Sequence, residues 1–321
     1  MRKRVVFICL LMLIAFSALF AEGKKDEKFP SKPIRIILPW APGGLAPTLA
    51  EMLKPILTDI LGVPVVTENK PGGGTAVGMK DLQISPPDGY TIGMNAAGIF
   101  GATHTTKGDV DYRNFELICS VTEDYYAITV HKDSPWNTLP EFLAYMKANP
   151  GQVRIGHSGV GSAYHVALIV FAQDMNVDIT AVPFGGGGPA LTALMGNHIE
   201  ATIVPFGDMT STLPTGQLRV LAVGAPVRDP FFPDIPTVKE VTGIDSVSGS
   251  FRCFFTPKET PLDRIKIIED AIKKATEHPT YVEFCNKNGI TNMFEGRDQY
   301  MSKYNAYADV MLRVLRTVDA Q

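Results

Sequence analysis

The chain has 321 residues, of which 45% are hydrophobic and 20% charged, and its formal net charge is −3. This composition is that of a globular protein, which excludes a disordered or fibrous chain, and the length suits two domains of ordinary size. The slight negative charge argues against nucleic acid or an anionic membrane surface as a partner.

The N-terminal segment has the pattern of an export signal. Residues 2–4 are basic, an apolar run extends over residues 5–20, and the sequence becomes polar directly after Ala21. These are the parts of a cleaved signal peptide, and the run is short for a membrane anchor, which is the alternative. We therefore predict a signal peptide at 1–21 and a soluble exported protein. Its removal takes three basic residues and no acidic one, leaving 27 Lys and Arg against 33 Asp and Glu, a net charge of −6.

Beyond the signal peptide, short β-branched runs alternate with longer amphipathic runs. Strands are predicted at 34–40, 63–69 and 90–96, with helices between them, and Gly62 has the position of a helix C-terminal stop. Alternation of strands and helices at this spacing predicts a parallel sheet with covering helices.

A second set of alternating strands and helices begins after about residue 124. Its clearest helix starts at Thr138, the predicted N-cap, with Glu141 as the partner in a capping box. Past Val247 the pattern changes to one more strand and then three helical segments, the last at 297–318.

This organisation predicts an α/β fold with two lobes, each a mainly parallel sheet covered by helices. We place the first lobe at 22–127 together with 249–321, and the inserted second lobe at 128–248. The chain then crosses between the lobes twice, near residues 123–126 and 247–249, with the ligand cleft between the lobes.

Four glycine-rich stretches fall at strand-to-helix turns: 39–48 (PWAPGGLAPT), 70–78 (KPGGGTAVG), 156–165 (GHSGVGSAYH) and 183–192 (PFGGGGPALT). Ligands of open α/β sheets bind at such turns. Glycine lets the backbone approach a ligand closely, and the first N–H groups of a helix lack internal partners, so the turns suit a carboxylate or phosphate. Because two turns belong to each lobe, facing lobes would bring all four to one cleft.

Several side chains beside these turns are candidates for ligand contact. Small hydroxyls supply hydrogen bonds, and aromatic rings next to the turns either line the cleft or pack in the core. A histidine in the helix after the third turn either contacts ligand or caps that helix. The residues concerned are Thr48, Thr75, Ser158, Ser162, Trp40, Phe184 and His165.

Enzymatic interpretations find less support. The stretch 156–160 (GHSGV) departs from the nucleophile-elbow pattern at Val160, where that pattern has glycine. The stretch 185–190 (GGGGPA) fits a dinucleotide-binding pattern with Asp208 about 20 residues on. A hydrolase using Ser158 and a nucleotide-binding enzyme therefore remain alternatives to a binding protein without catalytic activity, the function that we expect.

The cysteines of the mature chain are isolated. Cys119 and Cys253 lie in apolar strands, and Cys285 lies in a predicted helix. Their spacing is not that of metal ligands, so we expect no metal site, and we expect buried free thiols in preference to a disulfide.

The ordered set of motifs from Pro30 to the C-terminus closely resembles the Bug-type receptors, which are the periplasmic substrate-binding proteins of tripartite tricarboxylate transporters. The motifs are KPIRIILPWAPGG, VVTENKPGGGTAVG, SPPDGYTIGM, PFGGGGPALTALMGNHIEA and LAVGAPVRDPFFPDIPTVKEVTG. The resemblance implies a type II-like periplasmic-binding-protein fold that closes around one small organic carboxylate. It also implies a monomeric receptor without cofactor, and membrane permease subunits as partners.

The resemblance also implies which residues hold the ligand. In that family the first-lobe turn and the GxxGxGSxxH-like turn of the second lobe hold the carboxylate, partly through water. Together with the turn residues above, the predicted ligand-binding residues are Trp40, Pro42, Gly43, Gly44, Leu45, Ala46, Thr48, Gly74, Thr75, Asn95, Ser158, Gly159, Gly161, Ser162, His165, Phe184, Gly185, Gly186, Gly187, Phe206 and Asp208.

One residue departs from the family pattern. Where members have P-G-G-x-x-D in the first turn, this chain has Pro47 at the aspartate position. A proline side chain accepts no hydrogen bond, which favours a ligand held by backbone amides and apolar walls over an amino acid. A dicarboxylate or tricarboxylate, an aromatic acid and a vitamin-like acid all remain open. A receptor that presents its ligand to a membrane signalling protein is an alternative to transport.

Overall fold

The computed structural model describes residues 28–42, 45–209, 212–287 and 290–318. The predicted signal peptide at 1–21 lies outside these residues, as do Gly43 and Gly44 of the first glycine-rich stretch. No helix in the described part of the chain is long and apolar enough to cross a membrane.

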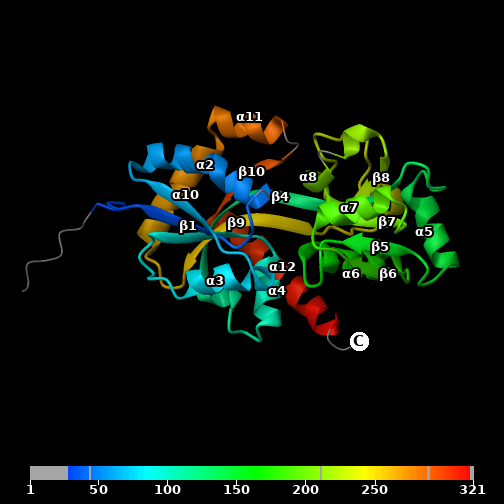
Figure 1. Cartoon of the computed structure of the whole chain (residues 1–321), viewed down its shortest axis with the longest axis horizontal. Helices are drawn as coiled ribbons and strands as arrows, with labels where there is room; N and C mark the ends of the chain where they lie inside the picture. Colours follow the sequence, from blue (N-terminus) through cyan, green and yellow to red (C-terminus); the bar gives the residue numbers. More distant parts are fainter. Residues whose placement is uncertain (1–27, 43–44, 210–211, 288–289, 319–321) are drawn as a thin grey trace, which may run out of the picture.

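Two long antiparallel strands connect the halves of the molecule. Strand β4 (Phe115–His131) pairs with β9 (Gly249–Pro257) as far as Tyr125, and from Tyr126 onward it pairs with β7 (Ala201–Pro205). β4 therefore belongs to one sheet at its start and to another at its end. Figure 1 shows β4 and β9 running between two lobes, so the predicted two-lobed α/β fold is confirmed. The exact lobe boundaries stay a prediction.

The first lobe has the strand order β2-β1-β3-β9-β4, with β10 antiparallel to β4. Its sheet is mixed, because β1 pairs in parallel with β2 and β3 while β9, β4 and β10 are antiparallel. Side chains alternate between the faces of a strand, so Ile36 packs under α2, α10 and α11 while Ile37 packs under α3, α4 and α12. The bounds are β1 (Ile34–Leu38), β2 (Val65–Asn69), β3 (Thr91–Asn95), β10 (Asn292–Gly296), α2 (Leu45–Leu61), α3 (Ala76–Gln83), α4 (Gly98–Thr105), α10 (Leu262–Thr276), α11 (Pro279–Lys287) and α12 (Arg297–Val318).

The second lobe is built on the same plan. β5 pairs in parallel with β6 and β7, and β8 pairs antiparallel with the end of β4. Ile203 and Val204, neighbours on β7, lie in different cores: Ile203 packs with residues of α5 and α6, and Val204 with residues of α7 and α8. The bounds are β5 (Arg154–His157), β6 (Thr180–Pro183), β8 (Leu218–Val223), α5 (Leu139–Ala148), α6 (Ala163–Met175), α7 (Gly187–Met195), α8 (Phe206–Met209) and α9 (Val238–Thr242).

Several local predictions can be compared with the structure. Thr138 caps α5 and forms the predicted capping box with Glu141, and α12 has the predicted bounds 297–318. Helix α4 and strand β10 were not predicted. The three described cysteines are free and buried, as expected.

Candidate ligand-binding site

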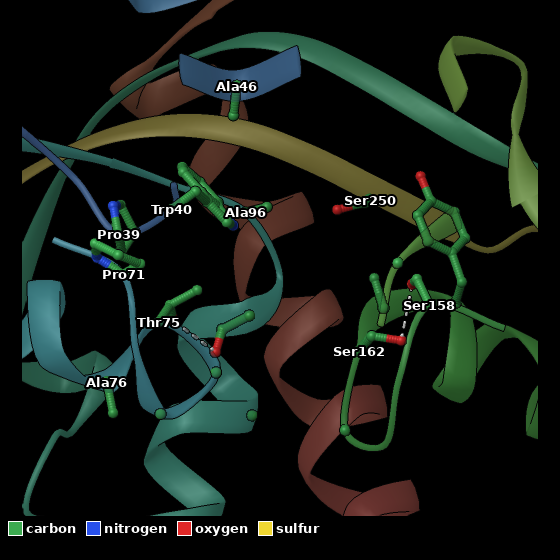
Figure 2. A pocket seen from close by; sticks show the side chains of 18 of the residues that line it. Pro39, Trp40, Ala46, Pro71, Thr75, Ala76, Ala96, Ser158, Ser162 and Ser250 are labelled. Atoms are coloured by element: carbon green, nitrogen blue, oxygen red, sulfur yellow. Dashed lines mark hydrogen bonds between the residues drawn. The ribbon is translucent and has the colours of Figure 1, made fainter. Parts of the chain in front are cut away.

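A cavity of about 1010 Å³ lies between the lobes. It is lined by the turns that follow β1, β2, β5 and β6, so all four glycine-rich stretches contribute to one site. Helix α4, strand β9 and Asp208 of α8 add to the lining. Figure 2 shows Trp40 and Pro71 on one side, Ser158 and Ser162 on the other, and Ser250 between them.

The two lobes approach each other closely at the cavity. A Cβ atom on Gly101 of α4 would lie 2.8 Å from the carbonyl oxygen of Gly161 in the second lobe. Similarly, a Cβ atom on Gly207 would lie 3.1 Å from Cδ2 of Leu45 in the first lobe. Real Cβ atoms essentially never lie within 3.0 Å of a heavy atom outside their own residue and its two chain neighbours. The missing side chain at Gly101 is therefore a condition for the observed approach of the lobes.

The first-lobe wall after β1 is apolar. Trp40 and Leu45 line it together with Pro47, which lies buried in the first turn of α2. Proline is tolerated there because the first helical N–H groups need no partner within the helix. The turn is fixed by Asn69, whose side-chain N–H₂ donates to the Trp40 carbonyl oxygen at 2.9 Å. This wall offers van der Waals contact to the body of a ligand.

The second turn of the first lobe presents unusual backbone. Gly72, Gly73, Gly74 and Thr75 all have positive φ, from +55° to +133°, a conformation that only glycine adopts without strain. Helix α3 begins directly afterwards without a side-chain cap, and its first two N–H groups, of Ala76 and Val77, donate to the carbonyl oxygens of Gly73 and Gly72. The helix start therefore offers a ligand the positive end of its dipole. The buried Asn95 amide donates to the Thr75 hydroxyl at 3.4 Å. Asn95 itself does not line the cavity, so it supports the turn from behind.

The second-lobe loop after β5 is held by side-chain hydrogen bonds. The Ser162 hydroxyl accepts the backbone N–H of His165 at 3.1 Å and thereby caps α6. The Ser158 hydroxyl donates to Ser162 at 3.1 Å, as the dashed line in Figure 2 shows. Both serines line the cavity. The loop therefore presents two ordered hydroxyl groups at the start of a helix.

Two stacked imidazole rings support this loop. The His157 and His165 centroids are 4.4 Å apart with an interplanar angle of 13°. Nδ1 of His157 donates to the Gly159 carbonyl oxygen at 3.1 Å, and Nδ1 of His165 accepts the Gly161 N–H at 3.2 Å. Burial, together with the neighbouring His165 ring, lowers the pKa of His157 to about 4. Burial also lowers the pKa of His165. Both rings are thus neutral at pH 7 and act as positioning residues.

The fourth glycine-rich turn lies next to a carboxyl group of the protein. Gly185 and Gly186 line the cavity, but a Cβ atom on Gly187 would lie 1.9 Å from Oδ2 of Asp208. The carboxyl group of the protein itself therefore lies against the first residue of α7. Burial raises the pKa of Asp208 to about 6. The nearby Tyr164 hydroxyl is buried and makes no hydrogen bond within the described residues, although its side chain also lines the cavity.

The residues predicted from the sequence do not include the polar side chains that β9 contributes to the cavity lining. Ser250 and Arg252 of β9 line the cavity, and Arg252 forms a buried ion pair with Asp124 of β4. The sequence does contain a signal for them. Ser250 and Arg252 are two positions apart in the apolar run SGSFRCFFTP, so in a strand their side chains lie on the same face. Lys70, the one Lys or Arg in the four glycine-rich stretches, pairs with Glu68 and Asp81.

The structure brings together about half of the predicted ligand-binding residues. Gly43 and Gly44 lie outside the described residues, and the remaining ones fall into two groups. Those that line the cavity are Trp40, Leu45, Ala46, Gly74, Thr75, Ser158, Gly161, Ser162, Gly185, Gly186 and Asp208. Those described but absent from the lining are Pro42, Thr48, Asn95, Gly159, His165, Phe184, Gly187 and Phe206.

Local packing explains why two of the predicted side chains, Phe206 and His165, do not line the cavity. Phe206 stacks on Phe232 with ring centroids 4.2 Å apart, inside the second lobe. His165 is 7% exposed and faces the loop backbone as described above. In both cases proximity to a glycine-rich turn in the sequence did not decide the direction of the side chain.

The hydrogen bonding of Ser158 does not support a serine nucleophile. The Ser158 hydroxyl donates a hydrogen bond to the Ser162 hydroxyl, and it makes no hydrogen bond to a histidine in the described part of the chain. A serine nucleophile needs an adjacent base. Within the same residues, no group of three or more His, Cys, Asp or Glu could hold a metal ion.

Two lobes with a cavity between them and glycine-rich turns facing it define the class of solute-binding receptors. Residues 49–313 match the tripartite tricarboxylate transporter family receptor. The chain belongs to this family, and the predicted Bug-type relationship is confirmed.

Individual relatives agree with this assignment. A UPF0065 protein of Bordetella pertussis is 30% identical over 291 residues, which cover 90% of this chain and 88% of the relative. A TctC solute-binding protein from Polaromonas, solved without ligand, has a TM-score of 0.79 at 27% identity, covering 90% of this chain and 99% of that one. The Rhodopseudomonas palustris protein MatC, solved with bound malate, has a TM-score of 0.74 at 24% identity, covering 89% and 100%. A second R. palustris protein, solved with adipate, has a TM-score of 0.77 at 23% identity, covering 90% and 98%.

Proposed function

We propose that the protein is a periplasmic receptor that binds a small organic carboxylate in the cavity between its lobes and delivers it to membrane permease subunits of a tripartite transporter. The observation that carries the proposal is the convergence of amide-rich turns from both lobes on one cavity. Family membership supports the delivery step. Malate and adipate, bound by two proteins of the same fold, are of the ligand class that we extend to this chain.

The chemistry of the two walls suits a carboxylate. The turn before α3 and the loop before α6 each place the start of a helix at the cavity, one from each lobe. An anion at a helix N-terminus gains about 0.3–1 kcal/mol when exposed and up to about 2 kcal/mol when partly buried. Contributions from both lobes favour the closed arrangement, so a ligand shifts the lobes toward it by its differential affinity.

Isothermal titration of the purified mature protein tests the binding step. The panel comprises succinate, glutarate, adipate, malate, citrate, benzoate and nicotinate, with NAD and ATP as non-members of the class. We expect stoichiometric binding of at least one carboxylate, which mass spectrometry recovers unaltered. Turnover of the bound compound, or binding of NAD or ATP alone, would contradict the proposal.

The delivery step needs a separate measurement. Cells that lack the receptor gene should lose uptake of the isotope-labelled ligand and regain it when the gene is restored. Uptake that is unchanged in the deletion strain, with binding intact in vitro, would favour the sensing alternative over transport.

A further inference from the structure

The two strands that join the lobes carry a polar patch on one face. Register pairs Arg252 with Thr122 and Ser250 with Asp124 across β9 and β4. Residues two apart in a strand point to the same side, so these four side chains share one face. All four are at most 9% exposed, and Ser250 and Arg252 line the cavity. The patch lies where the cavity meets the junction of the lobes.

The guanidinium of Arg252 is only partly satisfied by the protein. Its Nη1 donates to Asp124 Oδ2 and, at 3.2 Å, to Thr122 Oγ1. No other hydrogen bond of this side chain is found among the described residues, although a guanidinium has further donors on Nε and Nη2. Burial lowers its pKa to about 10, so it remains protonated at neutral pH. A buried cation with unused donors is costly unless another group completes its bonding.

The charge distribution in the cavity singles out this side chain. Among the described residues that line the cavity, Arg252 is the only Lys or Arg, and Asp208 is the only acidic residue. The helix N-termini of α3 and α6 belong to other parts of the lining. The cavity thus has two kinds of anion-attracting feature: backbone amides at the turns and a guanidinium on the joining strands.

We propose that Arg252 is a specificity-determining residue that contacts a second acidic group of the ligand, while the first is held at the amide-rich turns. This inference rests on the proposed function as a carboxylate receptor. The receptor then discriminates dicarboxylates from monocarboxylates of the same chain length. Asp124 shares the guanidinium with the ligand and moderates its attraction, because it already neutralises part of the charge.

The alternative is that the pair of Arg252 and Asp124 only fastens the two joining strands. A structural fastener contributes to the stability of the fold but does not distinguish one ligand end from another. Comparing matched ligands separates these roles, because a monocarboxylate lacks the group that Arg252 would contact.

The experiment measures dissociation constants by isothermal titration for three matched pairs: succinate and butanoate, glutarate and pentanoate, adipate and hexanoate. For the best pair, the wild-type protein should bind the dicarboxylate roughly ten- to a hundredfold tighter, the range expected of a hydrogen bond to a charged group. In Arg252→Met this ratio should fall to near one through loss of dicarboxylate affinity. Arg252→Lys should restore part of the ratio, and Asp124→Asn should increase it.

A matched control removes an arginine of the same lobe that does not line the cavity. Arg297 pairs with Glu116 at 2.9 Å, so Arg297→Met should lower the melting temperature and leave the ratio unchanged. If Arg252→Met does not fold, the ratios of Arg252→Lys and Asp124→Asn carry the test.

Three outcomes overturn the inference while leaving the proposed function intact. These are a wild-type ratio near one, equal losses for both ligands in the Arg252 variants, or a ratio that does not respond to any substitution at 252 or 124. If the wild-type protein binds none of the six acids and none of the earlier panel, the proposed function itself fails, and the inference fails with it.

Discussion

The glycine-rich turns of the first lobe face the cavity mainly with backbone and apolar side chains, whereas the loop after β5 in the second lobe is held by side-chain hydrogen bonds. The segment from Gly72 to Thr75 has positive φ throughout and meets a helix without a side-chain cap. By contrast, Ser162 caps α6, and two neutral histidines support the loop before it. Recognition should therefore depend on backbone conformation in the first lobe and on supporting side chains in the second.

The largest effect is expected where the two walls meet. Gly101→Ala places a methyl group 2.8 Å from the Gly161 carbonyl oxygen, which hinders approach of the lobes. Overpacking costs roughly 1–3 kcal/mol, which corresponds to about a ten- to hundredfold loss of ligand affinity. Alanine also favours a helix over glycine by about 1 kcal/mol, which offsets part of this cost in the stability of the fold. Calorimetric titration should thus show a larger effect than thermal melting. Unchanged affinity would show that the ligand-bound lobes do not meet here.

A smaller effect is expected within the first wall alone. Gly74→Ala adds a methyl group at φ +59°, with no heavy atom within 4 Å of the new Cβ. Alanine disfavours this conformation by about 1–2 kcal/mol, so the turn should relax and affinity should fall about tenfold. Gly216→Ala is the matched control, since Gly216 has φ +67° and equally open space but does not line the cavity. Both variants should lose similar stability, and only Gly74→Ala should lose affinity. If Gly74→Ala and Gly216→Ala bound the ligand with equal affinity, this would argue against ligand contact at the turn that contains Gly74.

Asp208 makes the second wall sensitive to pH. Its carboxyl group, with a pKa of about 6, is charged at pH 7.5 and largely protonated at pH 5. A charged carboxylate beside an anionic ligand is repulsive, so affinity should rise severalfold as the pH falls from 7.5 to 5. Asp208→Asn should bind more tightly at pH 7.5 and remove this part of the dependence, while titration of the ligand itself affects both proteins equally. Weaker binding by Asp208→Asn would instead show that Asp208 accepts a hydrogen bond from the ligand.

The smallest effect on affinity, but a clear one on stability, is expected from His157. Its pKa is about 4 in the folded protein against 6.5 ordinarily, so the unfolded state binds more protons between these values. The free energy of unfolding should therefore fall as the pH is lowered from 6.5 to 4, by at most about 1.4 kcal/mol per pH unit. Urea denaturation across this range should show a shallower decline in His157→Asn. An identical decline would assign the pH dependence to other groups. Asp208 contributes with the opposite sign, because its raised pKa makes the folded state bind more protons.

Local signals in the sequence predicted much of the fold. The capping box at Thr138 and the amphipathic run at 297–318 gave helices with correct starts, because the information lies within a few residues. Helix α4 was missed because residues 99–102 are all buried, so the segment lacks the apolar–polar alternation of a surface helix. The four glycine-rich turns likewise identified most of the cavity wall.

Features that depend on the pairing of strands far apart in the sequence could not be predicted. Arg252 meets Asp124 only because β9 aligns with β4, more than 120 residues earlier in the chain. The direction of a side chain beside a turn was equally unpredictable. His165 contacts the Gly161 backbone, although it lies only three residues after the cavity-lining Ser162.

A crystal structure of the protein with the tightest-binding carboxylate of the panel tests the central claim most directly. The account predicts one carboxylate group within hydrogen-bonding distance, about 2.7–3.2 Å, of backbone N–H groups from both the Gly74–Ala76 turn and the Ser158–Ser162 loop, directly or through one water. A ligand bound outside this cavity, or held there by side chains of a single lobe, would contradict it.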